Sequence, residues 1–281
     1  MTLRLSGGGW EATILPGLGG ALSRLTLDGD DVLAPLPDGA DPNATRAGAF
    51  LMLPWTNRLD GGRLPHPGGV HRYPVNRPDE GNAIHGLGRD APWEVAEGAA
   101  GHAVLTQRHA DADGPYRYVA RLEVTLGDAF VLRLDVTNEG ADGVPYGTGW
   151  HPFFVRPAGV RLAFRATGAV SRDARNLPLG VGPTGGVDGG EDAILGSDTH
   201  YVGWDGTAAL DLGGPRLLLR AEGAWSRNLQ LFAPRETPVL AVEPVSHVPD
   251  VINRRALAPH GDMAALPRGG VIAGSAALSR R

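Results

Sequence analysis

The chain has 281 residues, a formal net charge of −5 and no cysteine, and 42% of its residues are hydrophobic. The absence of cysteine excludes thiol nucleophiles, thiolate metal sites and disulfides. The sequence also contains no lysine, which excludes Schiff-base catalysis and a phosphate-binding loop ending in Gly-Lys-Ser/Thr. The negative net charge gives no electrostatic reason to expect nucleic-acid binding.

Glycine and proline are abundant, with 42 and 23 residues, and both are unfavourable in helix interiors. Together with the hydrophobic content, this composition indicates a folded, β-rich chain, and its length is compatible with one domain over residues 1–281. No stretch approaches the ~18 to 20 apolar residues of a membrane helix, and the first residues lack the pattern of a signal peptide. We therefore expect a cytoplasmic protein with no membrane partner.

Short segments with strand-like alternation occur throughout the chain and are separated by turn residues. They lie at 11–15, 21–27, 69–75, 102–108, 160–166, 207–212, 215–220, 228–233 and 238–243. No convincing helical stripe of ten or more residues is present. Two segments rich in Gly, Asp and Pro, 28–48 and 173–199, are predicted loops. This pattern predicts an all-β antiparallel sandwich or barrel with little helix.

The clearest signal is a long hairpin between residues 116 and 138. Hydrophobic residues from Ala120 to Leu126 alternate with polar ones, and the same alternation resumes from Leu132 to Val136. Gly127 and Asp128 separate the two halves as a turn of hairpin type. One face of this hairpin is therefore expected to lie in a core and the other to be polar.

Four polar sites stand apart because small or apolar residues surround them. They are Pro54-Trp55-Thr56-Asn57-Arg58, Asn82-Ala83-Ile84-His85-Gly86, Gly149-Trp150-His151-Pro152-Phe153-Phe154 and Val239-Leu240-Ala241-Val242-Glu243-Pro244. Each has an ordinary structural explanation, such as a hydrogen-bonded core histidine or a solvated strand end. None of them alone justifies a functional hypothesis.

Together these segments resemble the aldose 1-epimerase (galactose mutarotase) family over residues 50–255. PWTNRLDGGR is similar to the family's Pro-Trp-x-Asn-Arg signature, NAIHGLGRDAPW to its Asn-x-x-His-Gly block, and GWHPFF to its Gly-aromatic-His-Pro block. DTHYVGWDG resembles the later Asp-x-x-aromatic-x-Gly segment, and AVEPVSHVPDVIN the block with the catalytic glutamate. Five blocks in the correct order make the resemblance specific.

The resemblance implies a large antiparallel β-sandwich of the galactose mutarotase type, with the site in a cleft on one sheet. It implies an isomerase that interconverts the α and β anomers of a free aldohexose, with no metal or other cofactor. The implied catalytic residues are Glu243 as general base, His151 as general acid and His85 as an assistant near the ring oxygen. The implied residues that hold sugar hydroxyls are Arg58, Asp198, Asn57 and Asn82.

Some positions depart from this pattern or carry no implied role. Thr199 follows Asp198 where many relatives have histidine, so the sequence departs from the family pattern directly beside Asp198. His247 lies near the glutamate block, where we interpret it as structural. Trp55, Trp150, Phe153 and Tyr201 are the aromatic residues that could cover the apolar face of a sugar.

The implied residues suit anomer interconversion chemically. A base removes the proton of the C1 hydroxyl while an acid protonates the ring oxygen O5, and ring closure reverses both transfers. A carboxylate and a histidine, with reference pKa values of about 4.3 and about 6.5, can exchange these roles.

Two other functions remain open from the sequence. One is a hexose-6-phosphate 1-epimerase. Members of that related branch have Phe-Gly at the position where this chain has Asn57-Arg58, so the Asn-Arg pair favours an unphosphorylated sugar. A non-catalytic sugar-binding protein is the other, although it would not need His85, His151 and Glu243 together. The sequence predicts neither the physiological aldose nor the oligomeric state.

Overall fold

The computed structural model describes residues 2–281, and the regular secondary structure of this part consists almost entirely of antiparallel strands. In this part of the chain the helical elements are short, namely α1 (Glu191–Ile194) and a 3₁₀ helix (Arg255–His260). The predicted all-β class with little helix is confirmed. None of the helices in the described part is long and apolar enough to cross a membrane.

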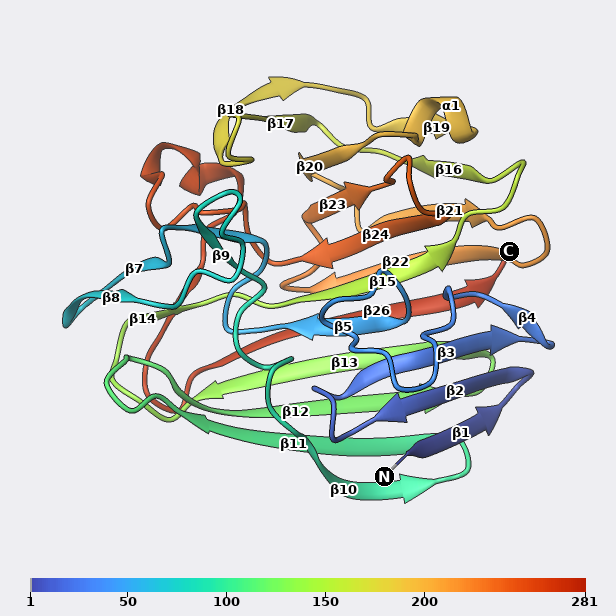
Figure 1. Ribbon diagram of the computed structural model, residues 1–281, viewed down its shortest axis with the longest axis horizontal. Coiled ribbons are helices and arrows are strands. Elements are labelled where there is room, and N and C mark those ends of the chain that lie inside the picture. The colour runs from blue at the N-terminus through green and yellow to red at the C-terminus, as the bar shows by residue number, and fades with distance from the viewer. Residues whose placement is uncertain (1) are drawn as a thin grey trace.

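Two large sheets stack face to face (Figure 1). The larger sheet has eleven strands in the order β1-β2-β3-β5-β15-β24-β23-β20-β17-β18, with β4 paired to β3. Their bounds are β1 (Leu3–Gly7), β2 (Trp10–Leu15), β3 (Ala21–Leu27), β4 (Asp30–Asp31), β5 (Ala49–Met52), β15 (Gly149–Val155), β17 (Gly168–Arg172), β18 (Pro178–Pro183), β20 (Asp198–Val202), β23 (Asn228–Phe232) and β24 (Val239–Val245).

The second sheet has nine strands in the order β10-β11-β12-β13-β26-β22-β21-β16-β19. Their bounds are β10 (Glu94–Ala99), β11 (His102–Ala110), β12 (Arg117–Leu126), β13 (Ala129–Asn138), β16 (Arg161–Phe164), β19 (Val187–Gly189), β21 (Thr207–Asp211), β22 (Arg216–Gly223) and β26 (Val271–Arg280). Three two-stranded ribbons complete the fold. They pair β6 (Arg58–Asp60) with β9 (Asn82–Ile84), β7 (Arg63–His66) with β8 (Gly69–Arg72), and β14 (Val144–Tyr146) with β25 (Ala264–Leu266).

The predicted hairpin is present as β12 and β13, joined through Gly127 and Asp128. Its inward-facing side chains, such as Leu122 and Leu134, are completely buried, whereas the alternating polar residues are partly or fully exposed. The alternation therefore places one face of the nine-stranded sheet against the other sheet, as the sequence indicates. Contacts such as Phe130 with Trp150, whose ring centroids are 5.8 Å apart, join the two layers.

Most of the shorter strand predictions coincide with observed strands, but residues 173–199 are more ordered than expected. This segment contains β18, β19 and α1 instead of a plain loop. Strand ladders are made by backbone groups, so a segment rich in glycine can pair when its neighbour is fixed. Here β18 pairs with β17, and β19 pairs with β16.

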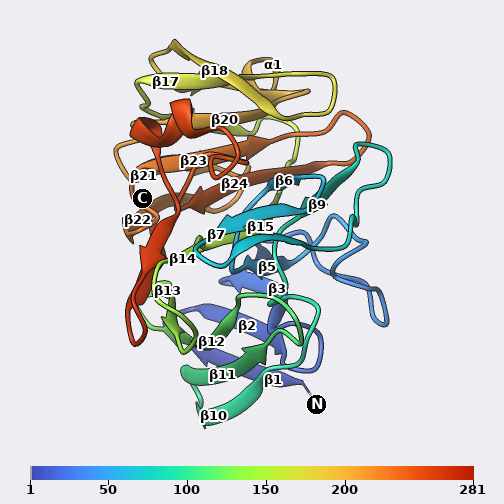
Figure 2. The same cartoon turned by 90° about the vertical axis from the view of Figure 1, so that its left-hand side faces the viewer.

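The eleven-stranded sheet has apolar residues on both faces. The face toward the second sheet belongs to the main core, which includes Trp150 and Phe154. The outer face carries a smaller apolar cluster made of Phe50, Met52, Phe153, Val239, Ala241 and Val245. Figure 2 shows the ribbon of β6 and β9 on this outer side, where it covers part of the face. The central strands thus support a second, partly covered surface.

Replacement of Leu134 by alanine tests the importance of the core between the sheets. Leu134 is fully buried, so Leu134→Ala is expected to lower the free energy of unfolding by about 2–5 kcal/mol. Val131, on the outer face of the same strand, is 36% exposed, and Val131→Ala should change the free energy far less. Denaturant titration of both variants measures the difference, and equal losses would contradict this description of the sheet.

Candidate active site

One row of side chains across four neighbouring strands forms the floor of the site. Phe50 on β5 pairs with His151 on β15, and Glu243 on β24 pairs with Gln230 on β23. The pairs Gly149–Val245 and Phe153–Ala241 then place His151 opposite Glu243 between β15 and β24. Directly opposed residues of antiparallel strands project on the same face, so this row points away from the main core.

The two central members of this row are in direct contact. Nε2 of His151 lies 3.3 Å from Oε1 of Glu243, and the two residues are 6% and 2% exposed. Among residues 2–281, Oε2 of Glu243 and Nδ1 of His151 have no hydrogen-bond partner. A buried carboxylate with one unused oxygen beside an imidazole is able to accept and return a proton of a bound molecule.

His85 joins the pair from the loop that follows β9. Its ring packs edge-on against His151 and Phe50, with centroids 5.2 and 5.4 Å away. The backbone N–H of His85 donates to the Asn57 carbonyl oxygen. Gly86 allows the sharp turn at this point, since it has φ +71° and a Cβ there would lie 2.0 Å from the Leu53 carbonyl oxygen. This glycine therefore fixes where His85 enters the site.

Burial shifts the pKa values of Glu243, His151 and His85 in the directions that favour the neutral form of each group. Burial, and secondarily the charge of Asp198, raises the pKa of Glu243 well above its ordinary value, while Arg58 opposes the rise. Burial and the charge of Arg89 lower the pKa of His151 to about 3 and that of His85 well below the ordinary value. Burial therefore favours the neutral carboxyl of Glu243 and the neutral imidazole of His151.

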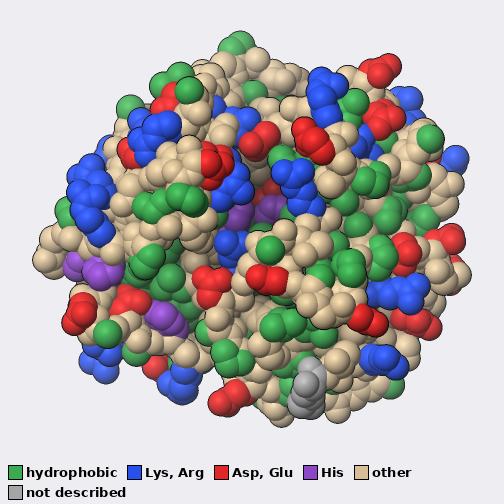
Figure 3. Space-filling model, viewed as in Figure 1, with side chains coloured by type: hydrophobic (Ala, Val, Ile, Leu, Met, Phe, Trp, Pro, Cys, Tyr) green, Lys and Arg blue, Asp and Glu red, His purple; other side chains and the backbone are tan. Residues whose placement is uncertain are grey.

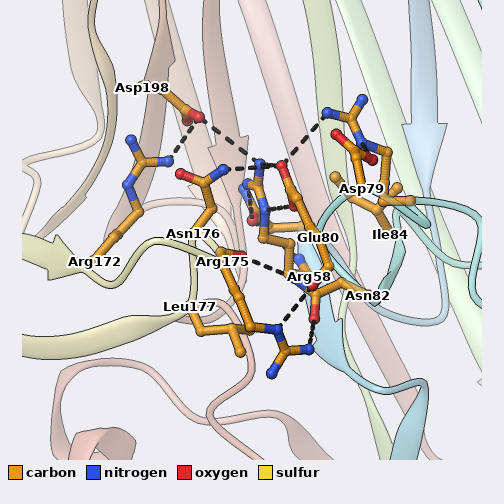
Figure 4. A network of polar contacts seen from close by, with 12 residues as sticks. Arg58, Asp79, Glu80, Asn82, Ile84, Arg172, Arg175, Asn176, Leu177 and Asp198 are labelled. Atoms are coloured by element: carbon orange, nitrogen blue, oxygen red, sulfur yellow. Dashed lines mark hydrogen bonds and ion pairs between the residues drawn. The ribbon is translucent and has the colours of Figure 1, made fainter.

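Arg58 lies at the edge of the floor and is held by a buried carboxylate. Its Nε and Nη2 donate to the two oxygens of Glu80 at 2.6 and 2.8 Å, and its Nη1 donates to Oδ1 of Asn57. The side chains of Arg58 and Glu80 are 7% and 8% exposed. The Arg58 guanidinium keeps the pKa of Glu80 at about 2, against the unfavourable effect of burial. This two-point contact fixes the plane of the guanidinium (Figure 4).

Asp198, at the start of β20, is fixed by three neighbours. Arg172 is 2.7 Å from Oδ2, Gln230 donates to Oδ1 at 2.7 Å, and Nη2 of Arg58 is 3.9 Å from Oδ2. The carboxylate thus lies between two arginines and next to Gln230, the neighbour of Glu243 in the row. It connects the rim of the site to its floor.

The loop between β17 and β18 supports this network from outside. Nδ2 of Asn176 donates to Oε1 of Glu80 at 2.9 Å, and Nε of Arg175 donates to the Glu80 carbonyl. Asn82 is fully buried, and both ends of its amide bond to Arg175. Asn82 therefore holds the loop in place and is not brought to the cavity, in contrast to the role that the family resemblance implies.

These residues surround a cavity of about 730 Å³. Figure 3 shows the hollow near the centre of this face, with histidine at its base and charged side chains around it. Of the sequence-predicted site residues, the cavity lining includes Glu243, His151, His85, Arg58, Asp198 and Asn57. Other lining residues come from the loops 41–46 and 76–90. The structure thus brings together residues that are nearly 190 positions apart in sequence.

The aromatic residues at the cavity differ from most of those considered from the sequence. Of the four candidates from the sequence, Phe153 lines the cavity. Phe50 and Phe232, which were not among the candidates, line it as well. Trp55 and Trp150 are 2% and 0% exposed and belong to the main core. Trp150 packs on Phe130 of the opposite sheet, and Trp55 packs against Tyr73 and Tyr116.

His247 has a structural role, as interpreted from the sequence. Its Nε2 accepts from the backbone N–H of Thr56 at 3.1 Å, and its Nδ1 lies 2.9 Å from the Val248 carbonyl oxygen. With both ring nitrogens engaged inside the protein, it holds the segment before Arg58 against the segment after β24.

Four further members of the site are not predicted by any sequence motif, namely Glu80, Asn176, Gln230 and Arg172. Gln230 would have been found from the strand register, because it lies directly opposite Glu243. The other three belong to segments without a sequence pattern. Among the described residues, no group of three or more His, Asp or Glu side chains is arranged to hold a metal ion.

Comparison with known proteins identifies the family. A model of the family described as aldose 1-epimerase matches residues 1–206, well over half of the chain. The chain belongs to the aldose 1-epimerase family. The enzymes of this family are isomerases that act on carbohydrates.

Curated relatives and solved structures agree with this membership. The aldose 1-epimerase-like chain is 30% identical over 125 residues to YphB and 28% identical over 155 residues to YihR, both uncharacterised proteins of Escherichia coli K12. The matches cover 44% and 54% of this chain, and the chain spans only 43% and 49% of those relatives.

Among solved structures, a galactose mutarotase-like protein of Clostridium acetobutylicum has a TM-score of 0.85 at 17% identity over 99% of this chain and 94% of that one. A galactose 1-epimerase of Lactobacillus acidophilus has a TM-score of 0.75 at 17% identity over 98% and 92%. At these identities the structures show that the fold is shared.

Replacement of Glu80 by glutamine tests the support of Arg58 in this member of the family. Glu80→Gln removes the charge that faces a buried guanidinium, so the free energy of unfolding is expected to fall by about 1–3 kcal/mol at pH 7. The folded-state pKa of Glu80, about 2, lies below its ordinary value of 4.5. Its contribution is therefore complete above about pH 4.5 and is lost as the pH falls toward 2.

Denaturant titration of wild type and variant from pH 7 to pH 2 measures this difference. Asp79→Asn is a suitable control, because Asp79 is the neighbouring carboxylate and is 66% exposed. The control should show little loss at any pH. A Glu80→Gln effect that stays constant down to pH 2 would contradict the assigned ion pair.

Proposed function

We propose that this protein interconverts the α and β anomers of a free aldohexose by acid–base opening and closure of the sugar ring. The observation that carries this proposal is the contact between Glu243 and His151 at the base of a polar-rimmed cavity, with Oε2 of Glu243 unpartnered. Membership of the aldose 1-epimerase family supports the same reaction.

In the proposed reaction, Oε2 of Glu243 accepts the proton of the C1 hydroxyl while His151 donates a proton to the ring oxygen O5. The C1–O5 bond breaks, its electron pair stays on O5, and C1 becomes an aldehyde. Rotation about the C1–C2 bond presents the other face of the aldehyde. Closure returns the proton from Glu243 to O1 and the proton from O5 to His151, so no proton is gained or lost. Each positioned transfer typically contributes about 10²- to 10⁴-fold.

The burial of the pair suits this cycle. Burial favours neutral Glu243 and neutral His151, which is the state that ring closure uses. Ring opening requires the proton on His151, and the 3.3 Å contact allows that exchange. A sugar hydroxyl that donates to Oε2 stabilises the carboxylate and therefore favours the exchange.

The charged network at the rim supports the proposed roles in sugar binding. Arg58 and Asp198 line the cavity with donors and an acceptor that are fixed before a sugar arrives, and Asn57 lies beside them. Fixed groups lose little conformational freedom on binding, which favours recognition of several hydroxyls at once. We place His85 near O5 as the assistant of His151, and Phe50 and Phe153 beneath the apolar face of the sugar.

A free galactose- or glucose-type sugar is the substrate we propose. The Asn57-Arg58 pair favours an unphosphorylated sugar, and the similar Lactobacillus acidophilus protein is a galactose 1-epimerase. We further propose that residues 1–281 act as one domain. In support, the main apolar cluster contains residues from Leu5 to Leu278.

Polarimetry on freshly dissolved α-D-galactose and α-D-glucose tests the reaction. The wild type should accelerate the decay to the equilibrium rotation, and Glu243→Gln should reduce the acceleration by at least ~10²-fold because the proton acceptor is lost. His151→Asn should have a comparable effect. Unchanged turnover in Glu243→Gln would remove Glu243 from the role of base. Sugar binding without any acceleration by the wild type would instead favour a non-catalytic binder.

The pH profile of kcat/KM tests the protonation scheme. Burial lowers the pKa of His151 to about 3, so in the free enzyme the imidazole takes up a proton only near that pH. Because kcat/KM reports pKa values of the free enzyme, we expect no change of kcat/KM centred near pH 6.5. A decline centred near pH 6.5, the value of an exposed histidine, would contradict the buried neutral imidazole.

A further inference from the structure

Arg89 is a buried cation at the cavity without a close partner. The residue is 9% exposed, and its Nε has no hydrogen-bond partner among residues 2–281. The nearest carboxylate oxygen, Oδ1 of Asp90, is 3.9 Å from Nε, which is too long for a hydrogen bond. Burial of a guanidinium is unfavourable unless other groups satisfy its donors, so this side chain is prepared for an acceptor that a ligand supplies.

The position of Arg89 connects it with the catalytic pair. Its guanidinium carbon lies 5.1 Å from the centre of the Phe50 ring, and the His151 ring stacks on the same phenyl group at 4.6 Å. Arg89 and His151 also line the same cavity. The positive charge of Arg89 therefore lies in the same part of the cavity as the imidazole of His151.

The other arginines at or near the cavity already have carboxylate partners. These pairs are Arg58 with Glu80 at 2.6 Å, Arg172 with Asp198 at 2.7 Å, Arg77 with Glu80 at 3.4 Å and Arg46 with Glu236 at 3.6 Å. In contrast, the pKa of Arg89 is lowered, because its burial outweighs the attraction of Asp90 and Asp41. Arg89 is thus the least compensated cation of the site.

We propose that Arg89 forms a binding subsite for a carboxylate on the sugar, so that the preferred substrate is an aldohexose oxidised at C6, a hexuronate. One planar guanidinium matches one carboxylate in charge and in its paired donor geometry. A phosphate monoester carries about −1.5 to −2 charges near pH 7, more than this single free cation balances. Asp41 and Asp90, which line the same rim, would repel the additional charge.

The location of C6 follows from the sugar itself and rests on the proposed function. O5 and C6 are both bonded to C5, so a substituent at C6 lies beside the group that protonates O5. With His151 at O5, the C6 carboxylate would lie on the side where Arg89 shares the Phe50 ring. A hexuronate is unphosphorylated, which agrees with the substrate class proposed above.

A carboxylate bound at Arg89 would also affect the pKa of His151, the proposed general acid. After burial, the charge of Arg89 is the main effect that lowers the pKa of His151. A bound carboxylate would offset that charge and favour the protonated imidazole, which ring opening requires. The anionic sugar would thus contribute to its own turnover as well as to binding.

The test compares mutarotation of D-galacturonate and D-glucuronate with that of D-galactose, D-glucose and D-glucose 6-phosphate. The wild type should have a kcat/KM for the better hexuronate that exceeds those of the neutral hexoses and the phosphate ester. Arg89→Gln keeps the length and some donors of the side chain but removes its charge. It should lower kcat/KM for the hexuronate by about 10- to 100-fold and change that of the neutral hexoses far less. Equal effects on both classes of sugar would overturn the subsite.

Arg46→Gln serves as the matched control, because Arg46 is an arginine at the same cavity that is 45% exposed. It should leave the preference for hexuronate unchanged. If glucose 6-phosphate is the preferred sugar and Arg89→Gln abolishes that preference, the assignment of a carboxylate is wrong. If all sugars react equally well in the wild type, Arg89 has no role in selection.

Thermal unfolding separates this inference from the proposed function. Hexuronate should raise the Tm of the wild type but not of Arg89→Gln, whether or not the sugar is turned over. A rise that depends on Arg89, without mutarotation of any sugar, would support the subsite and contradict the epimerase function. Mutarotation of galactose, without any Arg89-dependent effect of hexuronate on Tm or rate, would support the function and overturn the subsite.

Discussion

The alternation of side chains along β15 and β24 is the constraint on which the rest of this structure depends. In β15 the even positions Trp150 and Phe154 belong to the main core, while the odd positions His151 and Phe153 face the cavity. A shift of register by one residue would bury His151 between the sheets and expose Trp150. Core packing therefore fixes the positions of Glu243 and His151, because the same strands carry both core and cavity side chains.

This arrangement also explains how a buried carboxylate and histidines are tolerated. Burial favours the neutral forms of Glu243 and His151, so neither needs to be charged inside the protein. Permanent charges lie nearer the rim, where Arg58 and Glu80 neutralise each other. The charge left over is that of Arg89, and it lies where a substrate could balance it.

The sequence predicts the fold and the main site residues for different reasons. Alternation along the chain predicts the hairpin of β12 and β13, because one face of each strand is buried. The motifs predict Glu243, His151, His85, Arg58, Asp198 and Asn57 at one cavity. The orientation of Trp150 depends on the strand register. The Asn82 side chain is held by hydrogen bonds to Arg175, which lies in a loop distant in sequence. Glu80 and Asn176 join segments nearly 100 residues apart, and no local pattern encodes such a contact.

The floor and the rim of the cavity are built from different parts of the fold. The floor consists of cross-strand neighbours, so any change of its residues also alters the packing of the central strands. The rim includes side chains from residues 41–46 and 76–90 and from Asn176, where side-chain bonds such as Asn176 to Glu80 add to backbone hydrogen bonds. Substitution of Arg89 changes the charge that a sugar meets while the row from Phe50 to Gln230 stays in place. This part of substrate preference can therefore vary without a change of the floor, and Arg89, which contacts the Phe50 ring, lies where floor and rim meet.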